Sequence, residues 1–236
     1  MKRLAGLSPV WIAVVLLYGV AGIVSPAMLS RGQILNVLQV AAFLGLVATG
    51  QTVALLVGGI DLSVGGVVTL TNIVSTSVML GQDRNIPFAV ATCLTLGFLV
   101  GAINGTLVAV VRVAPLIATL AMNAILFGAA LVYTGGAPRG SAADGFKVLG
   151  QGTVAGLPAS AVSWLAVAAV VVGGTALTGG IGSAVATIGG TLFMTELVSF
   201  TNIARVSTGT QDIVQGVLIA MSVVVYRALD QRRRLT

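Results

Sequence analysis

The chain has 236 residues, of which 57% are hydrophobic and 8% are charged, whereas soluble domains carry about 25% charged residues. With a mean hydropathy of +1.08, this composition excludes a soluble globular domain and predicts a polytopic integral membrane protein. The net charge of +6 comes largely from basic residues near the two ends, so it does not indicate nucleic-acid binding.

The apolar pattern predicts an all-α fold, a single transmembrane helical bundle over residues 1–236 with about eight apolar segments, some of them broken or short. In chain order the expected segments are 10–29, 34–57, 64–80, 87–111, 116–134, 158–174, 181–200 and 212–226. The longest polar connection, residues 135–157, is rich in glycine and is expected to be a loop.

The basic residues predict that both termini face the cytoplasm, because Lys and Arg are enriched in cytoplasmic segments. An even number of spans agrees with this placement. The basic residues expected inside are Lys2, Arg3, Arg112, Arg227 and Arg232 to Arg234. Those expected outside are Arg31, Arg84, Arg139, Lys147 and Arg205.

The stretch LVGGIDLSVGG, residues 56–66, places an aspartate between two glycine pairs inside an apolar region. Glycine pairs permit a helix break, and the pattern predicts one here, followed by a short helix from near Val64. Asp61 or Ser63 is expected to cap that helix, and Asp61 could also line a pathway or gate, because intramembrane carboxylates are often functional. The glycines of this predicted break are Gly58, Gly59, Gly65 and Gly66.

A weak internal repeat relates residues 56–66 to residues 171–180. It aligns the first glycine pair with Gly173 and Gly174, and transporters are often built from two such repeats. Chance similarity in a glycine-rich chain is the alternative.

Three glycines four residues apart, Gly97, Gly101 and Gly105, predict a closely packed helix face. Asn104 lies near that face and is expected either to hydrogen-bond across a helix interface or to face a transport path. Glu196 is expected to pair with Arg205 or to reach the membrane interface.

The motifs of enzymes are missing from the sequence. A P-loop requires a lysine before Ser or Thr, whereas the two lysines, Lys2 and Lys147, precede Arg3 and Val148. No nucleophile–base pair, metal-ligand cluster or dinucleotide fingerprint is found either. We therefore expect a protein that is not an enzyme and that holds no metal or cofactor of its own.

Five segments resemble the permease subunits of bacterial ABC importers for ribose, xylose and related sugars. They are residues 50–68, 101–122, 131–136, 145–158 and 170–192, and they follow the order of that family over most of the chain. The GGIDLSVG element is the most specific of them.

The resemblance implies a permease in the bacterial plasma (inner) membrane that forms the translocation path as a homo- or heterodimer. It implies a cytoplasmic ABC ATPase that binds ATP and an external binding protein that delivers a monosaccharide. The candidate polar residues of the path are Gln51, Asp61, Ser63, Asn72, Asn104, Thr119 and Asn123.

The chain also departs from that family, because its usual members are longer. They carry extra helices and a cytoplasmic segment that contacts the ATPase, between the counterparts of residues 157–170 and 171–180. This segment is expected to be deleted as a block. The alternatives that stay open are a shortened or uncoupled permease, an inactive relic, the product of an internal deletion, and a standalone channel or secondary carrier.

Overall fold

The computed structural model describes residues 9–175 and 184–234, and most of this range is helical. The long helices are α1 (Pro9–Val24), α2 (Arg31–Leu56), α3 (Val64–Met79), α4 (Ile86–Ala109), α5 (Pro115–Thr134), α7 (Ala159–Thr175), α8 (Ala184–Ile203) and α9 (Thr208–Arg234). Each overlaps one of the eight predicted apolar segments, which confirms the all-α prediction. Short 3-10 helices η1 (Pro26–Leu29) and η2 (Asp83–Asn85) precede α2 and α4.

The prediction of a loop over residues 135–157 is wrong in its second half. This region contains the short helix α6 (Asp144–Gln151) and a hairpin of β1 (Thr153–Val154) and β2 (Leu157–Pro158). Between the strands, Ala155 and Gly156 both have positive φ, 52° and 80°, as a two-residue hairpin turn requires. The glycine that suggested a loop therefore closes a turn.

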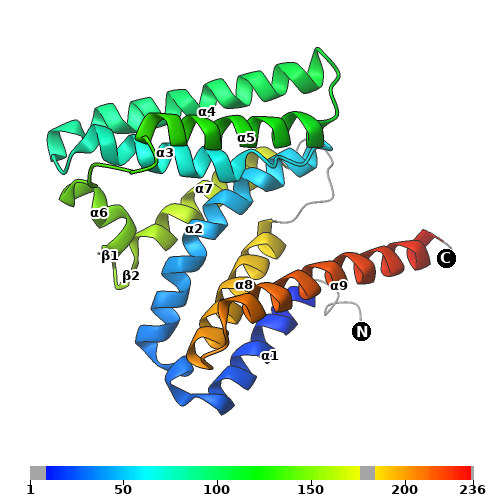
Figure 1. The fold of residues 1–236 in the computed structure, drawn as a ribbon. Coiled ribbons are helices and arrows are strands. Elements are labelled where there is room, and N and C mark those ends of the chain that lie inside the picture. Colours follow the sequence, from blue (N-terminus) through cyan, green and yellow to red (C-terminus); the bar gives the residue numbers. More distant parts are fainter. Residues whose placement is uncertain (1–8, 176–183, 235–236) are drawn as a thin grey trace.

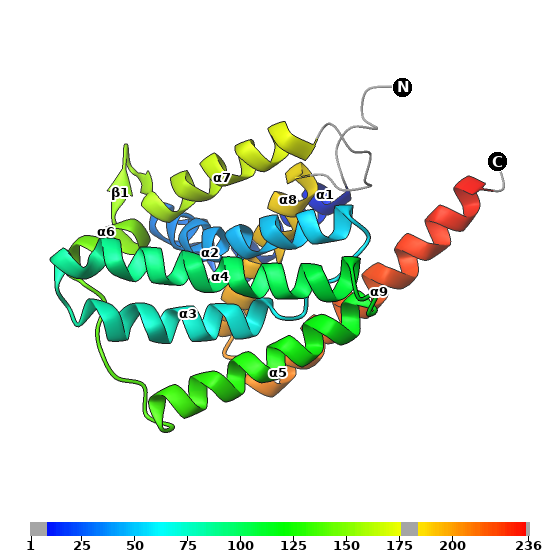
Figure 2. The same cartoon turned by 90° about the horizontal axis from the view of Figure 1, so that it is seen from above.

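Helices α3, α4 and α5 form one three-helix unit, seen at the top of Figure 1 and from above in Figure 2. Gly66 allows α3 to approach α5, because a Cβ at this position would lie 2.8 Å from the Cβ of Leu126. The buried core of the unit consists of Leu70, Val74, Val100, Met122, Leu126 and Ala130.

Helix α2 connects this unit to the rest of the molecule and packs along α7 and α8, while α8 also packs against α1 (Figure 1). Its contact with α7 centres on Trp164, which is 1% exposed. A Cβ at Gly45 would overlap the indole ring. The indole Nε1 donates a hydrogen bond to Thr49 Oγ1 at 3.3 Å, so the polar edge of the ring is satisfied.

The helix connections gather at two ends of the molecule. At one end, Gly81 N donates to Ser141 O at 2.9 Å, and Arg31 lies beside Gly156 of the hairpin turn. At the other end, Gly59 approaches Pro115 at the start of α5. Successive helices from α2 to α5 therefore run in alternating directions, as repeated membrane crossings require.

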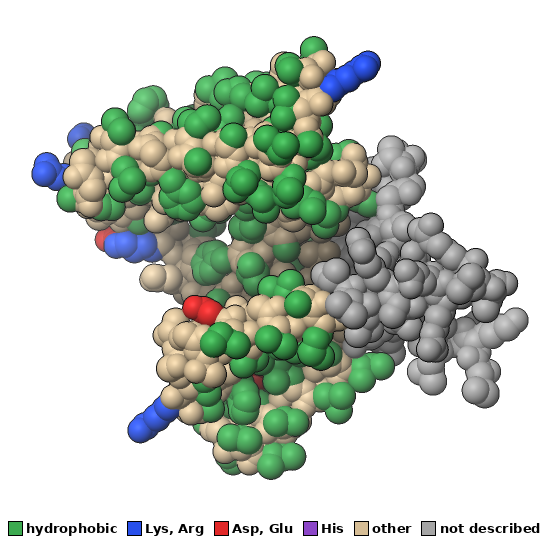
Figure 3. Space-filling view, turned by 45° about the vertical axis from the view of Figure 1, so that its right-hand side comes forward, with side chains coloured by type: hydrophobic (Ala, Val, Ile, Leu, Met, Phe, Trp, Pro, Cys, Tyr) green, Lys and Arg blue, Asp and Glu red, His purple; other side chains and the backbone are tan. Residues whose placement is uncertain are grey.

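The surface is largely apolar, and charged side chains appear only sparsely on the face in Figure 3. Among the described residues, three helical stretches are long and apolar enough to span a membrane: Arg31–Leu56, Asp83–Ala109 and Pro115–Thr134. On α4, Leu94 and Phe98 are 70% and 74% exposed, which is expected of side chains that face lipid.

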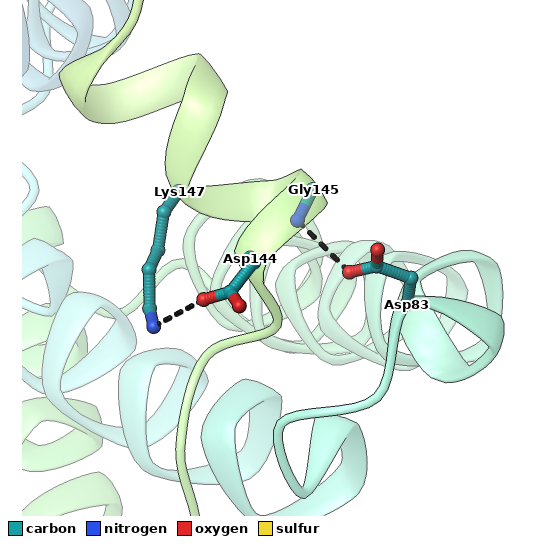
Figure 4. Close-up of polar contacts among 4 residues, drawn as sticks. All are labelled: Asp83, Asp144, Gly145 and Lys147. Carbon is teal, nitrogen blue, oxygen red and sulfur yellow. Dashed lines mark hydrogen bonds and ion pairs between the residues drawn. The ribbon is translucent and has the colours of Figure 1, made fainter.

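A polar clasp outside the apolar helices joins η2 to α6 (Figure 4). Gly145 N donates to Asp83 Oδ1 at 2.8 Å, and Lys147 Nζ lies 2.7 Å from Asp144 Oδ1. The hydrogen bond and the positive charge of Lys147 lower the pKa of the Asp144 carboxyl group below its ordinary value. Because both side chains are exposed, this pair orders α6 locally and contributes little to global stability.

Candidate functional site: a polar helix break

The predicted helix break is present between α2, which ends at Leu56, and α3, which begins at Val64. Gly58 has φ of +83°, a left-handed conformation that glycine adopts without steric cost. The turn is closed by Gly58 N, which donates to Leu55 O, and by Gly59 N, which donates to Ala54 O, both at 3.0 Å.

Asp61 holds the segment that leads into α3. Its Oδ1 accepts hydrogen bonds from Ser63 N at 2.8 Å and from Ser63 Oγ at 2.6 Å. Ser63 is the residue before the first residue of α3 and is fully buried. The carboxylate thus binds an N–H group at the positive end of a helix, where negative charge is favoured.

Two side chains of α5 bind the backbone of the break. Thr119 Oγ1 accepts from Leu62 N at 3.0 Å and lies 3.2 Å from Ile60 O. One turn further along α5, Asn123 Oδ1 accepts from Gly66 N at 2.8 Å. These bonds replace the helical partners that the break removes, as backbone groups at membrane depth require.

Asn104 of α4 and Gln51 of α2 complete the cluster. Asn104 Nδ2 donates to Ser63 Oγ at 3.0 Å, while its Oδ1 is buried and has no partner among the described residues. The Gln51 carboxamide faces the backbone of Asp61, its nitrogen 3.0 Å from the carbonyl oxygen and its oxygen 3.1 Å from the amide nitrogen.

The structure therefore brings together six of the seven polar residues that the sequence singled out. We call Gln51, Asp61, Ser63, Asn104, Thr119 and Asn123 the break cluster. The seventh, Asn72, is exposed on α3, and its side chain makes no hydrogen bond to the cluster. Because most of the hydrogen bonds of the break cluster go to backbone groups, its direct effect is to fix the junction of α2 and α3.

The other predicted glycine positions behave differently from one another. Gly65, like Gly66, faces Asn123 and would place a Cβ 3.6 Å from its Oδ1. At Gly97, Gly101 and Gly105, by contrast, a Cβ would meet no atom within 4 Å, so the predicted close packing is not found within the described part of the chain. That face of α4 is open.

The two halves of the predicted repeat differ where they can be compared. The first glycine pair lies in the break, whereas Gly173 and Gly174 lie within α7. Residues 176–180 of the second half lie outside the described residues.

The expectation for Glu196 is wrong. Its side chain is 0% exposed and makes no ion pair with Arg205. Within the described ranges, the ion pair that is found joins Lys147 to Asp144. The carboxyl group instead faces Tyr18 of α1. Helix α8 packs along α1, which turns this position inward rather than toward the membrane interface.

A second polar region, between α2, α8 and α9, was not found from the sequence. It is a hollow lined by Asn36, Thr195, Ser199, Asn202 and Gln215 together with apolar side chains. A signal was present, because residues 195, 199 and 202 follow the i, i+4, i+7 spacing of one helix face.

Comparison with known proteins identifies the family. Residues 33–165, which include the whole break cluster, match the family described as branched-chain amino acid transport system / permease component. The chain belongs to this permease family. It is therefore a membrane permease component and not an enzyme.

Named relatives of this permease are sugar and signal-molecule import permeases. The ribose import permease protein RbsC of Escherichia coli K12 is 38% identical over 151 residues, which are 62% of this chain and 47% of the relative. RbsC of Bacillus subtilis 168 is 35% identical over 147 residues, 61% and 45% of the two chains. The autoinducer 2 import system permease protein LsrC of Escherichia coli O9:H4 is 32% identical over 156 residues, 66% and 45%.

The permease spans less than half of the length of these curated relatives. No solved structure matches it.

Proposed function

We propose that this permease carries a ribose-like monosaccharide across the bacterial inner membrane as part of an ABC importer. One observation carries the proposal: the stretch matched to the permease family, residues 33–165, contains α3 to α5, all but the first two residues of α2, and the complete break cluster. The relatives that share this part of the chain include permeases named for ribose import. A permease for a neutral sugar agrees with the scarcity of charged side chains.

The proposal includes three protein partners. A cytoplasmic ABC ATPase would bind and hydrolyse ATP, since the chain has no P-loop. An external binding protein would deliver the sugar, and a second permease copy would complete the path. The open glycine face of α4, Gly97, Gly101 and Gly105, offers that copy a surface on which helices could approach closely.

In this proposal the break cluster positions the junction between α2 and the α3–α5 unit rather than holding the sugar. Asp61, Thr119 and Asn123 fix backbone groups. Because the side chains that hold it come from separate helices, the junction can keep one arrangement while the permease transports solute. Asp61→Ala should therefore lower transport by loosening the junction while leaving membrane insertion intact.

The test is co-purification followed by transport. The tagged permease is expressed with the ATPase subunit of its transport system and solubilised in mild detergent. We expect the two to co-purify and, in proteoliposomes supplied with the binding protein, to take up radiolabelled D-ribose in an ATP-dependent manner. The matched control is an ATPase whose P-loop lysine is replaced, which should bind the permease but abolish uptake.

The second candidate function is an uncoupled permease, and it is favoured by the departure from the family pattern between the counterparts of residues 157–170 and 171–180, where the segment that contacts the ATPase is expected. If the chain inserts stably and the ATPase never co-purifies, the importer role is refuted for this chain. Uptake that needs neither ATP nor binding protein would instead identify a channel.

A further inference from the structure

A hollow of about 480 Å³ opens between α2, α8 and α9. Helix α8 packs along α2, and the α2 residues that line the hollow lie between Asn36 and Leu44, on the part of the helix away from the break. The hollow is within the size range of about 300–1,000 Å³ of small-molecule sites. Its polar lining comes from all three helices: Asn36 of α2, Thr195, Ser199 and Asn202 of α8, and Gln215 of α9.

Two hydrogen bonds position the polar lining. Gln33 Nε2 donates to Ser199 Oγ at 2.6 Å, which joins α2 to α8. Gln211 Nε2 donates to Asn202 Oδ1 at 2.9 Å, which joins α9 to α8. The Ser199 hydroxyl keeps a proton to donate, and Asn202 keeps its NH₂ group.

Two further amides are unengaged. Asn36 and Gln215 make no side-chain hydrogen bond to any residue in the ranges 9–175 and 184–234. Each can offer a carbonyl oxygen and two N–H donors. Asn36 is exposed and Gln215 is half-buried; an apolar occupant such as an acyl chain that displaced water from them would leave these groups unpaired and is disfavoured.

The remaining walls select for a neutral ligand with apolar edges. They are formed by valine, leucine and methionine side chains, and none of the described residues that line the hollow is charged. An anion or cation would therefore meet no counter-charge there, in surroundings where burying an unpaired charge is costly. A polyhydroxylated ring would satisfy the amides through its hydroxyls and place its C–H faces on the apolar walls.

We propose that this hollow binds a neutral polyhydroxylated solute of monosaccharide size. The inference rests on the proposed function and deepens it, because it assigns the solute contacts to α2, α8 and α9 rather than to the break cluster. The site combines donors and acceptors from three helices, so its occupancy is coupled to their relative positions.

The chain is suited to a labelling test, because Cys93 is its only cysteine. In a Cys93→Ser background, Asn36→Cys and Asn202→Cys are introduced singly into the full chain in lipid nanodiscs, and their rates of reaction with a maleimide are measured. The probe is D-ribose over a concentration series, with sodium gluconate at matched osmolarity. Ser207→Cys is the matched control, because it is exposed between α8 and α9 and does not line the hollow.

We expect D-ribose to slow labelling at positions 36 and 202 several-fold, with no effect at 207 and none from gluconate. Gln215→Ala should raise the half-protecting concentration at position 36 by about 2–12-fold, the range that corresponds to one neutral hydrogen bond. Asp212→Ala, on the exposed face of the same helix, should leave it unchanged. Each variant is first checked for insertion and monodispersity.

Labelling that is equally fast with and without D-ribose would overturn the inference, as would equal protection by gluconate or at position 207. Because the assay uses the permease alone, its outcome is separate from that of the transport test. If ribose uptake is ATP-driven but D-ribose does not protect positions 36 and 202, solute binding in the hollow is refuted and the importer role stands. If D-ribose protects these positions but the ATPase never associates with the permease, solute binding in the hollow stands and the importer role is refuted.

Discussion

The stability of the α2–α3 junction should depend on the acceptor oxygen of Asp61. This oxygen receives two hydrogen bonds, from Ser63 N at 2.8 Å and Ser63 Oγ at 2.6 Å. Hydrogen bonds to a charged group contribute about 1.5–3 kcal/mol each, and Asp61 is only partly buried. Allowing for that exposure, we expect Asp61→Ala to lower the free energy of unfolding by about 2–3 kcal/mol.

The variant Asp61→Asn removes the negative charge but keeps an oxygen that can accept hydrogen bonds. The amide keeps one oxygen in the same place and should retain both hydrogen bonds in neutral form, at a cost of about 1 kcal/mol. The control is Asp83→Ala, because Asp83 also accepts a backbone N–H group, from Gly145 at 2.8 Å, but is exposed. Its expected effect is below about 1 kcal/mol.

Thermal unfolding in nanodiscs can be followed through Cys93, which is partly buried against α3 and donates weakly to Thr71 O. A thiol-reactive dye reports its exposure on unfolding without any added cysteine. An Asp61→Ala variant that melts like the parent would show that the carboxylate does not stabilise the junction. Equal losses for Asn and Ala would assign the effect to charge rather than to the acceptor oxygen.

Three further outcomes follow from the packing and the clasp. Gly45→Ala should destabilise the permease by about 1–3 kcal/mol, since the new methyl group overlaps the buried indole of α7; Gly50→Ala on the same helix meets no atom within 4 Å and should melt like the parent. Asn104→Leu should change stability by less than about 1 kcal/mol, because it loses one hydrogen bond but removes a buried unpaired oxygen; a large loss in the same melt would contradict this. Because the pKa of Asp144 is lowered, its pair with Lys147 is present at neutral pH and is lost as the pH falls through that pKa. Amide hydrogen exchange in α6, corrected for the intrinsic exchange rate, should then become faster in the parent. In Asp144→Asn, which lacks the pair at every pH, it should not.

Much of the fold could be predicted from apolar length alone, because backbone groups in a membrane must be satisfied within helices. The break was predictable for the same reason, since Gly58 and Gly59 interrupt an apolar run that is otherwise long enough to span. The hairpin was missed because the glycine of its turn, Gly156, has the same local signal as a glycine in a loop.

Contacts between segments that are distant in the chain could not be predicted from the sequence. Thr119 and Asn123 were chosen as polar residues in an apolar helix, and only the packing of α5 on α3 shows that they bind Leu62 and Gly66 of the break. Glu196 was misplaced for the converse reason, because its surroundings are set by α1 rather than by its own helix.

The break cluster and the hollow use different stretches of α2. The hollow is lined by α2 residues from Asn36 to Leu44, and the nearest member of the break cluster on α2 is Gln51, seven residues or about 10 Å further along the helix. Substitutions at Asp61 should therefore change stability first and transport as a consequence. Substitutions at Gln215 should change the response to solute at constant stability. Comparing melting with protection in the two variants tells whether the break cluster and the hollow have separable roles.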